Sequence, residues 1–399
     1  MVCKEIRVGF LLHEFGRFKN HGGIAAVYWD LVSGLIKSEP LMKIHVITTQ
    51  TIRSAAPPGV QIHQIDPGGT NLQRLERFKK KVLELDLHYV ETSDAFAMAA
   101  NLLSENRFKD HKFPVVEVAH HTGFREIWEW GTGRPISFAG YSIRDQAVLE
   151  ELQFKLSDVN TATSKFLAEE ISDKHPSISM EYSSFPNLDM EQADISSRRS
   201  RSPRSEFNVL SVGRWEGRKK QEDLVRATLV ARQRGQNIVS TFVGQSTIDW
   251  KTGLDYRLSI FGKIPRDDRT FFRFFGFQSP DAMDYLYDKS DLFCIPSPRE
   301  NFPTTAMEAV SRGIPVLASK YSGVADYSTQ TPELLFDPYV EGDLAAKLGF
   351  LSALPSAELD ELWQLQYVDA HRITDAQYSV ENKLERYQRL CTLALASAS

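Results

Sequence analysis

Short apolar runs alternate with segments of helical periodicity along most of the chain, and this alternation constrains the fold more than any other feature. The first run, residues 6–12, is typical of a strand covered on both faces of a parallel sheet, and a helical pattern follows it. Further strands are expected at 43–48, 86–90 and 113–119, with a helix at 72–85. Repeated strand–loop–helix units predict an α/β fold with doubly wound parallel sheets.

A polar segment divides this alternation into two domains. Residues 196–205 are serine, arginine and proline only, which is typical of a solvated linker, although an arginine–serine interaction tract is an alternative. We therefore expect an N-terminal domain over 1–193, a linker over 194–206 and a second βα domain over 207–377. A C-terminal helix at 378–396 is expected to pack back on the first domain.

Composition narrows the class of protein. The 399 residues include 47 Lys plus Arg against 52 Asp plus Glu, a mild acidity that argues against a nucleic-acid partner. The three cysteines form no Cys-x-x-Cys pair, which fits a reducing compartment. No apolar run reaches the roughly 18 residues that suggest a membrane span. A cytoplasmic location is therefore expected.

The most informative segment, residues 296–309, reads Pro-Ser-Pro-Arg-Glu-Asn-Phe-Pro-Thr-Thr-Ala-Met-Glu-Ala. It follows a strand and enters a helix, where Thr304 or Thr305 is expected to cap the backbone N–H groups. Glu300 then lies in the turn and Glu308 about one helical turn in, so both carboxylates can point into a cleft beside a helix N-terminus suited to an anion. A salt-bridged helix residue and a solvated turn residue are the ordinary interpretation of such a pair, but the prolines argue against it.

Together with Gly-Ile-Pro-Val at 313–316, this segment resembles the paired-glutamate signature of retaining nucleotide-sugar glycosyltransferases, in particular glycosyltransferase family four (glycosyl transferases group 1). The resemblance implies the GT-B fold, in which two Rossmann-like βα domains face each other across a cleft. It places the donor sugar near the first glutamate and the ribose at the second. The donor-binding residues that it implies here are Glu300, Asn301, Phe302, Pro303, Thr304 and Glu308. Pro303 has no N–H, so it shapes the turn.

A second motif, Val-Gly-Arg-Trp-Glu-Gly-Arg-Lys-Lys at 212–220, ends the first strand of the second domain. A departing diphosphate needs positive charge, and because no Asp-x-Asp metal motif stands beside an apolar strand, side-chain cations are expected to supply it. A solvated basic turn is the alternative. The family's Gly-Arg…Lys motif assigns the diphosphate to Arg214 and Lys219, with Lys220 as the alternative lysine. We expect no metal and no cofactor other than the nucleoside diphosphate sugar itself.

The first domain offers weaker signals. Gly22 and Gly23 follow the first strand, and paired glycines allow a backbone to approach a phosphate or a sugar closely. The resemblance assigns them to the donor and assigns a catalytic, donor-sugar histidine to His121, with His120 as the alternative by one position. It implies catalysis by positioning and charge stabilisation, with Glu300, His121, Arg214 and Lys219 as the catalytic group and no general base.

The resemblance implies a retaining, metal-independent hexosyltransferase of polysaccharide biosynthesis that acts on a hydroxyl of a glycan or lipid-linked glycan. A sugar-nucleotide epimerase of the same architecture and a catalytically silent nucleotide-sugar-binding module are the alternatives. A dinucleotide oxidoreductase is disfavoured, since no Gly-x-Gly-x-x-Gly turn follows a strand. The basic helix at 72–85 is either a solvated face or a peripheral contact with anionic lipid at the inner face of the membrane.

Overall fold

The protein is described here from a computed structural model, which forms two compact units. Unit 1 comprises Met1–Glu129, Pro135–Leu188 and Thr374–Ser399, and unit 2 comprises Trp130–Arg134 and Asp189–Ile373. The structure describes residues 6–16, 23–50, 56–106, 114–120, 137–138, 141–187, 190, 205–248 and 253–396, of which 137–138, 141–146, 376–378 and 393–396 are described by their backbone alone. Most of the expected linker, 194–204, lies outside these residues.

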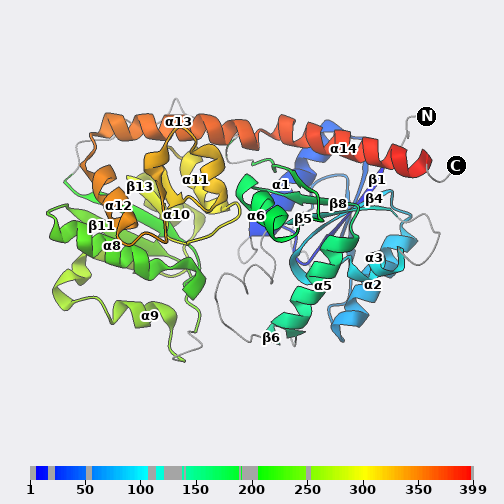
Figure 1. Ribbon diagram of the computed structural model, residues 1–399, viewed down its shortest axis with the longest axis horizontal. Helices are drawn as coiled ribbons and strands as arrows, with labels where there is room; N and C mark the ends of the chain where they lie inside the picture. The colour runs from blue at the N-terminus through cyan, green and yellow to red at the C-terminus, as the bar shows by residue number, and fades with distance from the viewer. Residues whose placement is uncertain are drawn as a thin grey trace. The chain divides into compact units, whose positions relative to one another are not determined.

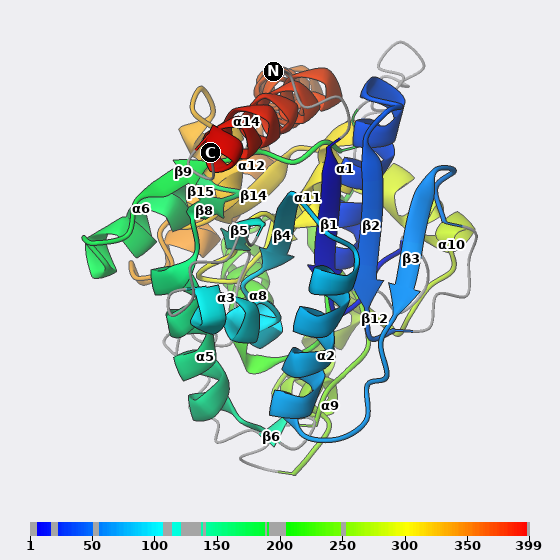
Figure 2. The ribbon, with the colours of Figure 1, turned by 90° about the vertical axis from the view of Figure 1, so that its right-hand side faces the viewer.

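Unit 1 is built on a seven-stranded parallel sheet in the order β3-β2-β1-β4-β5-β8-β9, which Figure 2 shows from β3 to β5. Its strands are β1 (Arg7–Leu12), β2 (Lys43–Thr48), β3 (Val60–Gln64), β4 (Tyr89–Ser93), β5 (Val115–His120), β8 (Val159–Ala162) and β9 (Met180–Tyr182). Its helices are α1 (Gly23–Ser38), α2 (Asn71–Glu84), η1 (Ala95–Ala97), α3 (Ala100–Asn106), α5 (Ile143–Leu156), α6 (Lys165–Lys174) and α14 (Ala376–Ala396). Strands β6 (Ser137–Phe138) and β7 (Tyr141–Ser142) pair in an antiparallel direction and form a separate two-stranded sheet.

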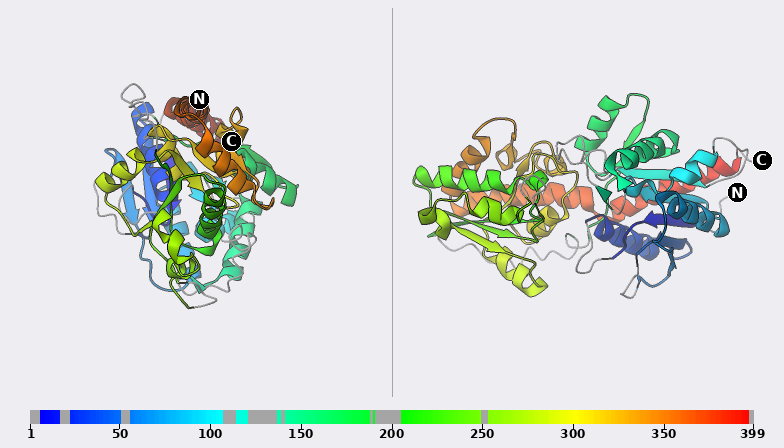
Figure 3. Two further views of the ribbon diagram at one scale, coloured as in Figure 1. Left: turned by 90° about the vertical axis from the view of Figure 1, so that its left-hand side faces the viewer. Right: turned by 90° about the horizontal axis from the view of Figure 1, so that it is seen from below.

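Helices cover both faces of this sheet, which is why its central strands are apolar on both sides (Figures 1 and 3). Alternate residues of β1 enter different cores. Phe10 packs into the cluster that includes residues of α1 and α14, whereas Leu11 packs into the cluster that includes residues of α2 and α3. A strand with one polar face could not be buried in this way.

Unit 2 repeats the plan with a six-stranded parallel sheet in the order β12-β11-β10-β13-β14-β15. Its strands are β10 (Phe207–Val212), β11 (Ile238–Val243), β12 (Phe272–Phe275), β13 (Leu292–Ile295), β14 (Val316–Ser319) and β15 (Leu335–Phe336). Its helices are η4 (Gly217–Lys219), α8 (Gln221–Gln233), α9 (Tyr256–Phe261), η5 (Arg266–Phe271), α10 (Pro280–Asp288), α11 (Thr304–Ser311), η6 (Gly323–Tyr327), η7 (Pro332–Leu334), α12 (Asp343–Ala353) and α13 (Ser356–Thr374). The cores on the two faces include α8 with α12 and α10 with α11 and α13.

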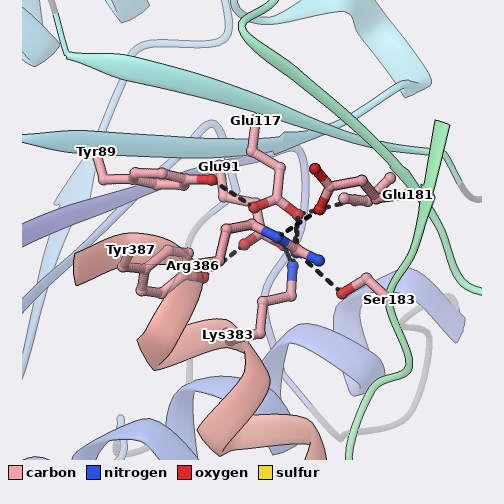
Figure 4. Close-up of polar contacts among 9 residues, drawn as sticks. Tyr89, Glu91, Glu117, Glu181, Ser183, Lys383, Arg386 and Tyr387 are labelled. Atoms are coloured by element: carbon pink, nitrogen blue, oxygen red, sulfur yellow. Dashed lines mark hydrogen bonds and ion pairs between the residues drawn. The ribbon is translucent and has the colours of Figure 1, made fainter. Parts of the chain in front are cut away.

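Helix α14 is fastened to the sheet of unit 1 by a buried charged network (Figure 4). Glu91 of β4 and Glu117 of β5 lie directly opposite each other in the strand register. Lys383 Nζ donates to Glu91 Oε1 at 2.8 Å and to Glu117 Oε1 at 2.7 Å, and none of the three side chains is exposed. The Tyr387 hydroxyl donates to Glu91 Oε2 at 2.6 Å, and Arg386 Nη1 donates to Glu117 Oε1 at 3.2 Å.

Two charges on one helix therefore neutralise two carboxylates on adjacent strands. Burial by itself would raise the pKa of Glu117, but the positive charges of Lys383 and Arg386 more than offset this effect and lower its pKa to about 2. Glu117 consequently stays ionised and holds both cations. These contacts make α14 an integral part of unit 1.

The predicted segments agree with the structure except at one central strand. The strand expected at 86–90 is β4, which runs from Tyr89 to Ser93. The expected strand leaves out the polar second half of β4, because a buried glutamate is unusual in a strand unless a distant residue neutralises it. That residue is Lys383, which is 292 positions from Glu91.

The basic face expected on α2 is largely paired with other groups. Arg74 is buried and donates to Asn71, and Lys79 forms ion pairs with Glu76 and Glu105 at 2.7 Å and 2.8 Å. These contacts give no support to the alternative that α2 contacts anionic lipid. No helix among the described residues is both long and apolar enough to cross a bilayer.

Candidate functional site

The strand order of unit 2 reverses between β10 and β13. Strands β11 and β12 extend the sheet on one side of this pair, and β14 and β15 extend it on the other. Because β10 pairs with β13, the loops that follow these strands start side by side at the carboxyl edge of the sheet, where open α/β sheets bind their ligands. Both motifs singled out in the sequence of unit 2 lie in these two loops.

The loop after β10 is held rigidly against its neighbours. Trp215 is fully buried, and its ring packs on Phe242 and Phe274 at 5.1 Å and 5.4 Å. Gly244 has φ +152°, and a Cβ atom on it would overlap the carbonyl oxygen of Gly213, so only glycine allows this close approach. Gly213 itself has open space where a Cβ atom would lie.

The loop after β13 presents Glu300 in a fixed orientation. Glu300 pairs with Ser322 in an isolated parallel bridge, and its carbonyl oxygen accepts from the Gly323 N–H at 3.1 Å. A Cβ atom on Gly323 would overlap the carbonyl oxygen of Asn301, so glycine is required there. Glu300 and Asn301 are both buried.

The two loops meet in a cluster of four charges. Lys219 Nζ donates to Glu300 Oε1 at 2.5 Å, and Arg218 Nη1 lies 3.4 Å from the same oxygen. Arg218 also donates from Nη2 to Glu216 Oε1 at 2.9 Å. Two cations thus face two carboxylates, and their side chains are between 10% and 24% exposed.

Electrostatics keep Glu300 ionised. Burial alone would raise its pKa, but the positive charges of Lys219 and Arg218 more than offset this effect and lower the pKa to about 2. For Lys219, burial and then the repulsion of Arg218 outweigh the attraction of Glu300, so its pKa is lowered. Glu300 can therefore accept hydrogen bonds from the hydroxyl groups of a ligand in its ionised state. Lys219 can interact with an incoming anion as a cation that is already partly removed from water.

Helix α11 starts at Thr304, and its N-cap is Pro303, which makes no side-chain capping hydrogen bond. The prediction that Thr304 or Thr305 caps the helix is wrong, because Thr304 is the first helical residue. In the helix, Glu308 is half-buried and accepts from the Tyr287 hydroxyl at 2.9 Å. The expected contact residues Phe302, Pro303 and Thr304 are also half-buried.

The predicted cations have different surroundings in the structure. Lys219 lies on Glu300, whereas the Arg214 side chain is exposed and makes no ion pair with the described residues. Lys220 is at the N-cap of α8 in a left-handed conformation, 3.8 Å from Glu222. The sequence analysis did not predict a role for Arg218, although this residue immediately precedes Lys219, to which the diphosphate was assigned.

Of the residues predicted in unit 1, Gly22 and His121 lie outside the described residues, and Gly23 is the first residue of α1. His120 is fully buried at the end of β5, where its Nε2 lies 3.0 Å from Asn160 Oδ1 and its ring packs on Phe154 at 4.1 Å. This environment gives His120 a structural role. Within the part of the chain that the structure describes, no three His, Cys, Asp or Glu side chains gather as metal ligands would.

The fold is that of two Rossmann-like α/β units, as predicted, and its structural neighbours are glycosyltransferases of the GT-B fold. Sucrose-phosphate synthase from Thermosynechococcus elongatus aligns over 99% of this chain and 100% of its own, with a TM-score of 0.71 and 17% identity. A glycosyltransferase from Rickettsia africae aligns over 97% and 98%, with a TM-score of 0.70 and 11% identity. The Anabaena protein HepE in complex with UDP aligns over 96% and 99%, with a TM-score of 0.64 and 15% identity.

Residues 192–362, slightly less than half of the chain, match the family model of glycosyl transferases group 1, so unit 2 carries a domain of this class. An uncharacterized glycosyltransferase of Methanocaldococcus jannaschii is 32% identical over 119 residues, which are 30% of this chain and 28% of that protein. The amylovoran biosynthesis glycosyltransferase AmsK of Erwinia amylovora is 25% identical over 162 residues, which are 39% of this chain and 37% of that protein. The matched regions thus span less than two fifths of these relatives.

Proposed function

We propose that the protein is a retaining glycosyltransferase of family four, which moves a hexosyl group from a nucleoside diphosphate sugar to a hydroxyl of a glycan or lipid-linked glycan. The observation that carries the proposal is the ion cluster of Lys219, Arg218 and Glu300 at the strand-order reversal of unit 2. A domain match to glycosyl transferases group 1 covers the same residues. Because the side chains of Lys219 and Arg214 would supply positive charge to the diphosphate, the proposed reaction needs no metal.

In the donor complex, Lys219 turns from Glu300 to the diphosphate, and exposed Arg214 adds a guanidinium that can bind phosphate in bidentate fashion. The α11 N-terminus, which lacks a side-chain cap, adds backbone N–H groups to the same anion. Glu300 accepts hydrogen bonds from hydroxyls of the donor sugar, and Glu308 accepts them from the ribose. Arg218 remains on Glu300 and keeps it ionised.

In the transfer step, the bond from the anomeric carbon to the diphosphate oxygen breaks, and a bond to the acceptor oxygen forms on the same face of the sugar. The acceptor's hydroxyl proton passes to an oxygen of the departing diphosphate. Lys219 and Arg214 stabilise the negative charge that develops there, so the barrier falls through charge stabilisation and positioning. Gly22, Gly23 and His121 are assigned to the donor side of the same proposal, on the family resemblance.

The biological setting is a further part of the same proposal. AmsK, one of the relatives, is a glycosyltransferase of amylovoran biosynthesis. We place this protein in polysaccharide biosynthesis in the cytoplasm, with a glycan or lipid-linked glycan as the acceptor. The ion cluster would serve an epimerase or a silent binding module equally well, so the transfer itself must be tested.

Donor binding is tested by thermal unfolding of the full chain with UDP, GDP and ADP. A ligand at 100 times its Kd adds about 2.7 kcal/mol of stability. We expect one nucleotide to raise the Tm of the natural protein and expect Lys219→Met to abolish the rise. Lys289→Met is the matched control, because Lys289 is 61% exposed and precedes β13 at the opposite edge of the sheet. Undiminished nucleotide binding in both Lys219→Met and Arg214→Ala would remove the assignment.

Transfer is tested by supplying the matching nucleotide sugar with a panel of glycan acceptors. A new glycoside with the anomeric configuration of the donor is the expected product. Interconversion of the donor without an acceptor would identify an epimerase. Donor binding without turnover on any acceptor or on water would identify a silent module.

A further inference from the structure

Unit 1 has a strand-order reversal of its own, between β1 and β4. Strands β2 and β3 extend its sheet on the side of β1, and β5, β8 and β9 extend it on the side of β4 (Figure 2). The loops after β1 and β4 therefore leave the carboxyl edge at the position where such a sheet binds ligands. In unit 2 the corresponding position holds the ion cluster, whereas in unit 1 the proposed function has so far used only Gly22 and Gly23, which follow β1 in the sequence.

The side chains at this position form a small aromatic site. His13 follows β1, and its ring packs on the ring of Phe96 with centroids 4.3 Å apart. Phe96 lies in the turn after β4 with φ 70°, and Ala97 follows with φ 47°. Asp94 supports this turn by accepting from the Ala95 N–H at 2.9 Å. Consecutive left-handed residues other than glycine are unusual, and such strain gathers at binding sites.

Only one of the two ring nitrogens of His13 has a hydrogen-bond partner among the described residues. Nδ1 lies 3.1 Å from Thr49 Oγ1, and the carbonyl oxygen of His13 accepts from Thr48 at 3.1 Å. No described residue hydrogen-bonds to Nε2 of this exposed histidine. The side chain is therefore oriented by the protein and still has a polar atom for a ligand.

The charge state of this ring indicates which ligand it suits. Partial burial lowers the pKa of His13, and the nearby positive charge of Arg74 lowers it further, so both effects favour the neutral ring. A neutral imidazole exchanges hydrogen bonds with hydroxyls but attracts a phosphate only weakly. The adjoining Phe96 ring is half-buried and adds apolar surface of the kind that packs on the C–H groups of a sugar.

We propose that His13 and Phe96 form the binding site for one sugar ring of the acceptor, with His13 Nε2 bonded to a sugar hydroxyl and Phe96 packed beside the ring. This inference rests on the proposed function, because it names the residues that recognise the hydroxylated substrate. His13 is a binding residue here, and the proton transferred in the reaction does not pass through it.

The experiment uses the full chain with selectively labelled histidine and records the Cε1–H resonance of His13 by NMR. The probes are the methyl glycosides of glucose, galactose, mannose and N-acetylglucosamine, added separately, with inorganic phosphate as a comparison. We expect at least one glycoside to shift the His13 resonance in a saturable way and expect phosphate not to do so.

Two substitutions at position 13 separate a binding role from a structural one. In His13→Gln the amide reaches the place of Nε2, whereas in His13→Asn it reaches only the place of Nδ1. Glycoside affinity, measured by ligand-observed NMR, should be largely kept in His13→Gln and fall about tenfold in His13→Asn, which corresponds to the loss of one hydrogen bond. Phe96→Gly, which relieves the backbone strain while removing the ring, should weaken glycoside binding too. His63→Asn on the outer strand β3 is the matched control.

The inference is overturned if no glycoside shifts the His13 resonance, if phosphate shifts it instead, or if His13→Gln and His13→Asn lose affinity equally. Nucleotide binding is measured on the same samples. Natural protein that binds a nucleoside diphosphate but gives any of these three results refutes the sugar site alone. Absence of nucleotide binding would count against the proposed function itself.

Discussion

At the scale of a single residue, Lys220 has a strained backbone conformation directly beside Lys219 of the candidate site. Its φ of 50° and ψ of 38° place it in the left-handed region, between the last residue of η4 and the first of α8. Such a conformation costs a residue with a side chain about 1–2 kcal/mol. Its ion pair with Glu222 is long, at 3.8 Å, and 43% exposed on the lysine side, so it offsets little of this strain.

Lys220→Gly is therefore expected to stabilise the protein by about 0.5–1 kcal/mol, once the greater freedom of glycine in the unfolded chain is allowed for. Urea unfolding of the two proteins measures the difference. Nucleotide binding should be unchanged, because Lys219 is the lysine that lies on Glu300. A variant that lost nucleotide binding would make Lys220 the diphosphate lysine.

The depressed pKa of Glu300 makes stability depend on pH in a defined window. In the unfolded chain a glutamate takes up a proton near pH 4.3–4.5, whereas in the folded protein Glu300 does so at about pH 2. Its contribution, about 3 kcal/mol, is thus present above pH 4.5 and is lost as the pH falls towards 2. Glu300→Gln should flatten this dependence.

Urea unfolding of both proteins at several pH values between 6 and 3.5 tests this expectation. The free energy of unfolding should fall more steeply with acid in the natural protein than in Glu300→Gln. Parallel curves would show that Lys219 and Arg218 do not hold Glu300 in the ionised state.

At the scale of elements, unit 2 depends on two loops that approach each other closely. Gly244→Ala would place a Cβ atom on the carbonyl oxygen of Gly213 and push the loop that carries Lys219 away from Glu300. We expect a loss of stability of about 1–3 kcal/mol and weaker nucleotide binding. Gly213→Ala is the matched control because its Cβ atom would meet no neighbour. Equal effects of the two substitutions in calorimetry and nucleotide titration would contradict the packing described.

Helix α14 should detach from its sheet when its central cation is removed. Lys383→Met leaves Glu91 and Glu117 buried without their shared partner, and breaking a buried ion pair from one side costs about 3–5 kcal/mol. Lys155→Met on α5 is the control, since its pair with Glu151 is exposed and contributes little. Urea unfolding gives both values, and similar losses would mean that the buried network does not anchor the helix.

For the whole molecule, hydrogen exchange should separate the two sites. A bound nucleoside diphosphate should slow exchange in unit 2 at 213–220 and 296–304, because those loops hold the ion cluster. A bound methyl glycoside should slow exchange in unit 1 around 13–16 and 94–97. Mass spectrometry of peptides from these segments measures both effects. Protection by nucleotide that was confined to unit 1 would contradict the placement of the donor.

The strands of the sheets could be predicted from the sequence because they are apolar on both faces. The apolar run at 207–212, for example, coincides with β10. The sequence was also informative for Glu300, whose neighbours form a dense local motif. It could not place Arg218 on Glu300, since that contact spans 82 positions. It could not single out His13 either, because a histidine after a strand gains meaning only when the order β2-β1-β4 places a reversal beside it.

The anchoring of α14 also governs when unit 1 is completed during synthesis. Glu117 leaves the ribosome 266 residues before Lys383, and the whole of Asp189–Ile373 is translated in between. Until α14 emerges, two carboxylates in the middle of a nascent sheet have no neutralising partners, so unit 2 can mature first while its older neighbour stays incomplete. A translational pause or a nonsense codon shortly before residue 383 would accordingly harm the half of the protein that was made earliest.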